Sequence, residues 1–260
     1  MYKSLSLITF ALVASVCAKS PSAQSFISDP YKVRVADAYY FSLKSGDSAK
    51  LMASDLTFKG TKSTPFAFDS LGSLVSMGDS LIFAADQGKG SELYRFCPND
   101  KDSKPRLIKD LVADGSSSPR ELTVLGEQAF FSASDGKRRE LYVFDGKNDS
   151  VSTVAAAHKI TVPADPVNLT VVGNKLFFSA GEAEEVKKGK KTRKVHQRRY
   201  YMLDTEKPGK IHGFAFFDQH TNQKHPMVDG TKLYFKIHEG PERYEILCID
   251  TDAAQPKVEV

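Results

Sequence analysis

One pattern recurs along this chain of 260 residues: a short apolar stretch that contains two adjacent large side chains, at least one of them aromatic. The pairs are Tyr40-Phe41, Ile82-Phe83, Phe130-Phe131, Phe177-Phe178 and Tyr234-Phe235. An Asp follows several of them: Asp55 and Asp145 come fourteen residues after the pair, Asp250 comes fifteen after it, and Asp204 comes twenty-six after it. A period this long is the signature of a repeat architecture, so it limits the possible folds more than any other feature of the sequence.

The clearest repeat runs from residue 118 to residue 156. Its pattern predicts four short strands, separated by turns rich in Gly, Asp and Asn: residues 122–125, 128–134, 140–144 and 151–154. Four strands in about 40 residues is the size of one blade of a β-propeller.

The whole sequence divides into five such units, at approximately residues 27–70, 71–115, 116–159, 160–218 and 219–260. We therefore predict an all-β fold, a single β-propeller of about five four-stranded blades that occupies residues 19–260. Stacked sheets cover one another's faces, and the aromatic pairs are expected to fill the gaps between them. Two alternatives stay open: the last blade is incomplete, or the C-terminal residues close the ring against the N-terminal segment.

Residues 88–146 resemble a known repeat. The matching stretches are Gly90–Tyr94, Gly115–Pro119, Phe131–Gly136 and Glu140–Gly146, which together are similar to the "ELW-x-x-DGT" repeat of hyalin-like and other secreted or cell-surface proteins. This chain has Tyr where that pattern has Trp, and it lacks the Thr after Asp-Gly. The resemblance implies an extracellular β-propeller. It brings no catalytic residue to this chain, because the repeat is a scaffold signature.

The first 18 residues have the features of a secretory signal peptide. Lys3 precedes a mainly apolar run from Leu5 to Val16, and small residues precede a cut after Ala18, with a second possible cut after Ala23. The run is too short to span a bilayer, and no later segment approaches the ~20 apolar residues of a membrane helix. We expect a secreted, extracellular protein with no membrane span.

Two cysteines remain after the signal peptide, Cys97 and Cys248. They occupy different positions of their repeats, which argues against a disulfide and predicts two mostly buried thiols. Two sequons, at Asn148 and Asn168, are predicted glycosylation sites. Asn148 lies in a predicted turn, whereas Asn168 begins a predicted strand.

The fourth unit contains an insertion, residues 182–199, which is polar on every side and is predicted to be a loop. Its basic residues are Lys187, Lys188, Lys190, Lys191, Arg193, Lys194, Arg198 and Arg199. The positive charge of these residues exceeds the formal net charge of the whole chain, which is +4. The rest of the chain therefore carries a net negative charge. The insertion is either a solvated hairpin tip, an anion-binding loop or a site of proteolysis at Arg198-Arg199. The anion would be a sulfated or acidic polysaccharide or an acidic matrix protein; no nucleic acid is expected.

Other candidate sites are weaker. His212, His220 and His225 lie close together in sequence, but their spacing matches no familiar metal-ligand pattern, so no metal site and no cofactor is predicted. The repeated Asp residues are read as turn residues rather than calcium ligands. Glu121 is the one acid near the start of a predicted inner strand, and one carboxylate does not make the pair that a glycosidase needs.

These observations predict a secreted, non-enzymatic β-propeller that serves as a binding or scaffold protein of an extracellular matrix. The alternatives are a propeller hydrolase that acts on glycans or nucleotides, and a lectin-like module. No nucleophile elbow, HExxH pair, P-loop or dinucleotide fingerprint is present.

Overall fold

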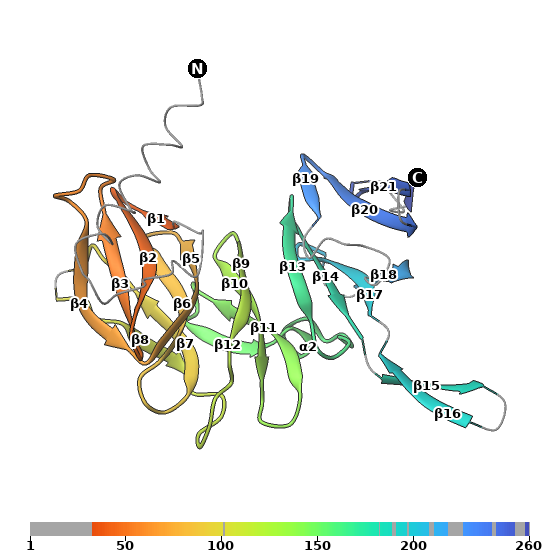
Figure 1. Ribbon diagram of the computed structural model, residues 1–260, viewed down its shortest axis with the longest axis horizontal. Helices are drawn as coiled ribbons and strands as arrows, with labels where there is room; N and C mark the ends of the chain where they lie inside the picture. The colour runs from red at the N-terminus through yellow and green to blue at the C-terminus, as the bar shows by residue number, and fades with distance from the viewer. Residues whose placement is uncertain are drawn as a thin grey trace. The chain divides into compact units, whose positions relative to one another are not determined.

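The computed structural model describes residues 33–259 except residues 101, 182, 189–190, 197, 208–210, 218–225, 241–242 and 253–257. The predicted signal peptide lies outside the described residues. Nearly all of the described chain is antiparallel β-structure (Figure 1). The chain forms two compact units, Met1–Arg120 and Glu121–Val260, which are described separately below.

The first unit contains two four-stranded sheets, called blade 1 and blade 2. Blade 1 has the order β1 (Val33–Val35), β2 (Ala38–Ser45), β3 (Ser48–Ser54) and β4 (Lys62–Phe68). Blade 2 has the order β5 (Ser70–Met77), β6 (Ser80–Asp86), β7 (Ser91–Phe96) and β8 (Arg106–Lys109).

The second unit contains three more four-stranded sheets, and its boundary falls at the first residue of β9. Blade 3 consists of β9 (Arg120–Leu125), β10 (Gln128–Ser134), β11 (Arg139–Asp145) and β12 (Ser150–Thr153). Blade 4 consists of β13 (Val167–Val172), β14 (Lys175–Ala180), β17 (Arg199–Asp204) and β18 (Ile211–Phe217). Blade 5 consists of β19 (Met227–Asp229), β20 (Lys232–Gly240), β21 (Arg243–Asp250) and β22 (Val258–Glu259).

The predicted fold class is confirmed, because the described residues form five four-stranded antiparallel sheets. Each sheet has its strands in chain order, which is the meander expected of a propeller blade, and in blade 4 an inserted hairpin separates the second strand from the third. The turn after the first strand of a blade needs a left-handed residue, and Gly78, Gly126, Gly173 and Gly230 supply it with φ values of 55°, 60°, 55° and 57°.

Within each of the two units, the aromatic pairs fill the spaces between blades, as predicted. Successive residues of a strand point to opposite faces of its sheet, so the two members of a pair pack in opposite directions. Phe178 packs with Phe130 and Leu141 of blade 3, whereas Phe177 packs with Leu233 and other residues of blade 5. In the first unit, Phe83 of blade 2 packs against Tyr40 of blade 1.

The insertion of the fourth unit differs from the prediction. It forms a two-stranded antiparallel hairpin of β15 (Ala183–Lys188) and β16 (Lys191–His196), rather than a loop. In Figure 1 this hairpin extends away from the sheet of blade 4. The prediction failed because these two strands lack the alternation of apolar and polar residues by which strands are recognised in a sequence. The register places Glu185 opposite Lys194.

Two smaller features complete the fold. A short helix, α2 (Val154–His158), follows β12, and the Thr153 side chain caps it by accepting a hydrogen bond from the backbone N–H of Ala156.

Cys97 and Cys248 are both free thiols and both half-buried. Within the described part of the chain, no helix has the length and apolar character needed to cross a membrane.

Candidate functional site

The first strands of blades 3 and 4 begin with the same unusual backbone. Ser118 and Asp165 each precede a proline, and each has a positive φ, 46° and 52° respectively. Three residues later, Glu121 and Asn168 also have positive φ values, 61° and 59°. Left-handed conformations are uncommon for residues other than glycine and cost of order 1–3 kcal/mol each. Their repetition at equivalent positions marks the start of β9 and of β13 as a candidate functional site.

Hydrogen bonds to the preceding blade hold both segments. The backbone N–H of Ser118 donates to the carbonyl of Ser91 at 3.0 Å, and the backbone N–H of Asp165 donates to the carbonyl of Arg139 at 2.9 Å. Ser91 and Arg139 are the first residues of β7 and β11, so the two contacts are equivalent. The left-handed residues are therefore fixed by their surroundings, the condition under which strained backbone persists.

Glu121 connects blade 3 to blade 4. Its Oε2 accepts a hydrogen bond from the backbone N–H of Asn168 at 2.9 Å. The side-chain amide of Asn168 in turn donates to the hydroxyl of Ser179 at 3.2 Å, and Ser179 is fully buried. Glu121 and Asn168 are both half-buried. The arrangement gives a carboxylate and an amide, each at the start of the first strand of its own blade.

The base of the β15–β16 hairpin is attached beside this site. Nη1 of Arg198 donates to the carbonyl oxygen of Asp165 at 2.6 Å, and Nη2 forms an ion pair with the Asp165 carboxylate. On the other side of the hairpin, the N–H of Gly181 donates to the carbonyl of Ala164 at 3.1 Å. Both ends of the insertion are thus tied to the segment that leads into β13.

The predicted basic residues are spread along this hairpin. Lys187 and Lys188 end β15; Lys191, Arg193 and Lys194 lie on β16; Arg199 begins β17; Lys190 lies outside the described residues. The side chain of Arg198 forms an ion pair with Asp165 of the same chain.

A second carboxylate, that of Glu92, is not predicted to have a special role from the sequence. Glu92 is only 4% exposed, and its two oxygens accept hydrogen bonds from the backbone N–H of Ser117 at 2.7 Å and from the Ser117 hydroxyl at 2.5 Å. It also accepts from the N–H of Leu111 at 3.3 Å. These bonds join residues 19 and 25 positions apart, so Glu92 holds the loop between β8 and β9 in place. The repeat pattern gave no sign of this, because such a contact depends on a loop conformation.

The repeated Asp residues are turn residues, as predicted. The carboxylates of Asp55, Asp145, Asp204 and Asp250 each accept a hydrogen bond from the backbone N–H two positions later. The hydroxyl of Thr57 and then its N–H hold the pKa of Asp55 below its usual value. At Asp145 the side-chain amide of Asn148 makes the largest contribution in the same direction, lowering its pKa.

The predicted glycosylation site Asn148 and the predicted histidine cluster lie apart from this candidate site in the sequence. Asn148 is exposed, and its side-chain amide donates to Asp145 at 2.7 Å. His212 packs edge-on against Phe214, whereas His220 and His225 lie outside the described residues. No group of three or more His, Cys, Asp or Glu residues suited to a metal ion occurs in the ranges that the structure describes.

The fold is shared with propellers of known structure. The β-propeller domain of the Trilobed protease from Pyrococcus furiosus, described as having an open velcro topology, aligns with a TM-score of 0.55, 14% identity and 90% coverage of this chain. TolB from Acinetobacter baumannii aligns with a TM-score of 0.52, 14% identity and 87% coverage. A prolyl endopeptidase aligns with a TM-score of 0.58, 12% identity and 88% coverage. The alignments span 70%, 55% and 34% of those three chains.

No protein-family model matches the chain, and no curated protein matches its sequence. The prediction of a secreted matrix scaffold is nevertheless wrong by this comparison. The propeller domains of peptidases and TolB are among the structures that this chain is similar to, and the similarity shows the propeller fold. The error arose because the resemblance to the secreted repeat covered a single stretch, residues 88–146, whereas the structural similarity extends over most of the chain.

Proposed function

We propose that this chain is a peptidase-type β-propeller that binds polypeptide segments, and that cleavage of the peptide bond belongs to another domain or another protein. The observation that carries the proposal is the five-blade fold, which aligns over 88–90% of the chain with the propeller domain of a protease and with a prolyl endopeptidase. The endopeptidase alignment spans only 34% of that protein, so the activity of the whole enzyme does not follow from the propeller.

The polar groups at the start of β9 and β13 suit a polypeptide ligand. A peptide backbone offers N–H donors and carbonyl acceptors at regular intervals. The Glu121 carboxylate has about four lone-pair positions, and one of its oxygens accepts a hydrogen bond from the N–H of Asn168. It is half-buried, so a ligand N–H or a terminal amine can approach it. The rigid backbone around it gives such an acceptor a fixed direction.

Binding rather than bond cleavage is proposed because the described side chains assemble no nucleophile with a base. Nε2 of His158 is buried without a hydrogen-bond partner, and His212 packs against Phe214. Hydrolysis of a glycoside, the alternative considered from sequence, needs two carboxyl groups that flank the bond. The position equivalent to Glu121 is an amide, Asn168, in blade 4 and Ser73 in blade 2.

The test is a binding measurement with fluorescent peptides from a denatured protein digest, followed by fluorescence anisotropy. Glu121→Gln keeps an oxygen for the Asn168 N–H but removes the charge, and we expect about tenfold weaker binding, since a hydrogen bond to a charged group contributes about 1.5–3 kcal/mol. Glu127→Gln, at the opposite end of β9, is the matched control and should bind as the unchanged chain does.

Two results would refute the proposal. One is the absence of saturable binding to any peptide fraction by the intact chain. The other is peptide-bond cleavage by the purified chain alone, which would make it an enzyme rather than a binding propeller.

A further inference from the structure

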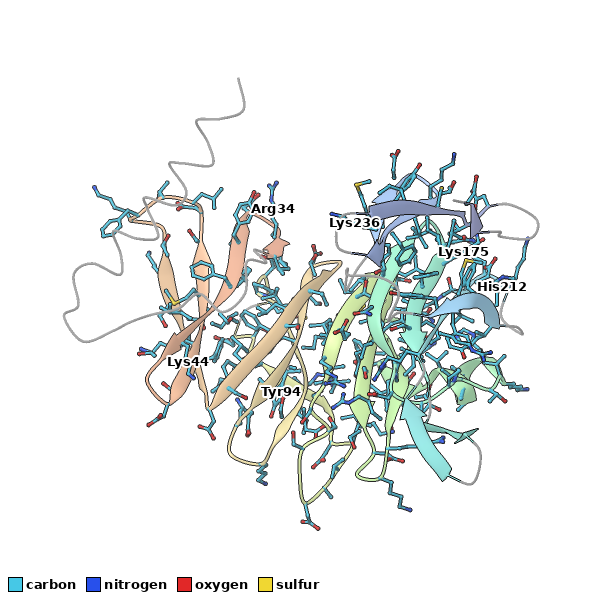
Figure 2. The ribbon with its side chains drawn as sticks, turned by 45° about the vertical axis from the view of Figure 1, so that its right-hand side comes forward. Arg34, Lys44, Tyr94, Lys175, His212 and Lys236 are labelled. Carbon is cyan, nitrogen blue, oxygen red and sulfur yellow. The ribbon has the colours of Figure 1, made fainter. Side chains whose placement is uncertain are left out.

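The distal part of the β15–β16 hairpin carries a concentrated positive charge. Residues 186–188 and 191–194 form this part, which is called the basic tip. Five of its seven residues are Lys or Arg and none is Asp or Glu, so its formal charge is +5. Lys175 at the start of β14 is a contrast, because it forms an ion pair with Asp252 at 2.6 Å, and it lies at the end of blade 4 away from the hairpin (Figure 2). The basic tip has no acidic residue of its own to balance its charge.

The hairpin leaves blade 4 at the same end as the candidate site. β13 and β14 are antiparallel, and Val167, the first residue of β13, pairs with Ser179 near the end of β14. The Asn168 amide donates to the hydroxyl of the same Ser179, four residues before β15 begins. The bonds from Arg198 to Asp165 attach the other end of the hairpin to the segment that precedes β13. The candidate site therefore adjoins the base of the hairpin, within one compact unit.

The basic tip is within reach of a ligand that is bound at the candidate site. Nine positions separate Ser179 from Lys188 in the chain. A chain of nine residues spans at most about 32 Å, so the far end of β15 lies no further than that from Ser179. A polypeptide of about 12 residues covers about 40 Å when it is extended. One such segment is therefore long enough to contact the Glu121 carboxylate and the basic tip together.

On the basis of the proposed function, we propose that the polypeptide segments bound at the candidate site are acidic, and that the basic tip binds their Asp and Glu side chains. Carboxylates are the anionic side chains that polypeptides carry, and hydrogen bonds between them and Lys or Arg are roughly twice as strong as neutral ones. The charge of the tip also attracts such a ligand before contact, over a Debye length of about 8 Å at physiological ionic strength. Because Glu121 repels carboxylates, the acidic residues are expected several positions away from the residue that it binds.

Fluorescence anisotropy with synthetic peptides of about 20 residues tests this selectivity in the full chain. Two peptides share a segment of a digest peptide that binds, and the segment is followed by a block of six Glu in one and six Gln in the other. A second pair has the block at the opposite end. In at least one pair, we expect the Glu peptide to bind about tenfold more tightly than the Gln peptide at about 50 mM salt. The ratio should fall several-fold at about 500 mM salt, because salt screens the attraction.

Two triple variants separate the basic tip from the total charge of the chain. In the first, the tip variant, Lys187→Gln, Lys188→Gln and Lys191→Gln together should lower the affinity for the Glu peptide to that for the Gln peptide. Its affinity for the Gln peptide should stay unchanged, which also shows that the variant is folded. The control makes the same change of charge at three exposed lysines at the other end of their blades: Lys147→Gln, Lys207→Gln and Lys232→Gln. The control should keep the preference for the Glu peptide.

The inference and the proposed function fail in different ways. Equal affinities for the two peptides, both weakened by Glu121→Gln, overturn the inference and leave the proposed function intact. A preference that survives in the tip variant does the same. Binding of the Glu peptide that Glu121→Gln leaves unchanged refutes both, because the ligand is then not held at the candidate site. Tighter binding of a heparin hexasaccharide than of the Glu peptide assigns the tip to a sulfated polysaccharide and also overturns the inference.

Discussion

The packing between blades 4 and 5 leads to a quantitative prediction. Phe177 is 0% exposed, and its ring contacts those of Tyr200, Phe214 and Phe235, with centroids 5.2, 5.5 and 5.5 Å away. Phe177→Ala should destabilise the second unit by about 3–5 kcal/mol, from the lost transfer free energy and the cavity left behind. Three aromatic contacts place the value in the upper part of that range, because each pair adds about 0.5–1.5 kcal/mol.

The matched control is Tyr234→Ala, which truncates the equivalent residue of the next repeat. Tyr234 is half-buried, so its truncation should cost less than half as much. Urea unfolding followed by circular dichroism gives both free energies, with the slope of the transition showing whether the unfolded state has changed. Equal losses for the two variants would refute this reasoning, because the loss of stability is expected to follow how deeply each side chain is buried.

Two further predictions concern single residues. Burial lowers the pKa of His158, whose Nε2 has no hydrogen-bond partner, so the free energy of unfolding should be constant above the unfolded pKa of about 6.5 and fall as the pH drops below it. His158→Gln should flatten this fall in pH-dependent urea unfolding; an unchanged pH profile would contradict the assignment. Arg198→Ala removes the contacts to Asp165, so cleavage of the β15–β16 hairpin by a lysine-specific protease should accelerate several-fold, whereas Arg199→Ala serves as control. Equal cleavage rates for the unchanged chain and Arg198→Ala would show that this ion pair does not hold the hairpin.

The sequence was a good guide wherever the chain repeats. The aromatic pairs predicted both the number of sheets and the filling of the gaps between them, because burial between stacked sheets demands large apolar side chains at a fixed position of every blade. The Asp turns were predictable for a related reason: a carboxylate that accepts from the N–H two positions later acts locally, within its own turn.

The candidate site was only partly visible. The sequence indicates that Glu121 is an acid near the start of an inner strand. It does not indicate the hydrogen bond from Asn168, because the two residues are 47 positions apart in the chain. The left-handed backbone at both residues is also invisible in composition, since neither residue is a glycine. Glu92 and Ser117 illustrate the same limit, because their contact exists only after the loop between β8 and β9 has folded. Function is harder to predict from the sequence than the fold, because the spacing of strands is the same in a scaffold protein and in the propeller of a peptidase.

Each four-stranded sheet takes all its strands from one repeat, and this has a consequence for how the number of repeats can evolve. No four-stranded sheet of the described residues borrows a strand from a different repeat. Duplication or deletion of one whole repeat at an end of the array would therefore leave every remaining ladder of backbone hydrogen bonds complete. Relatives of this chain are expected to differ by whole modules of about 40 residues, and an ancestor with fewer modules would already have possessed self-sufficient sheets.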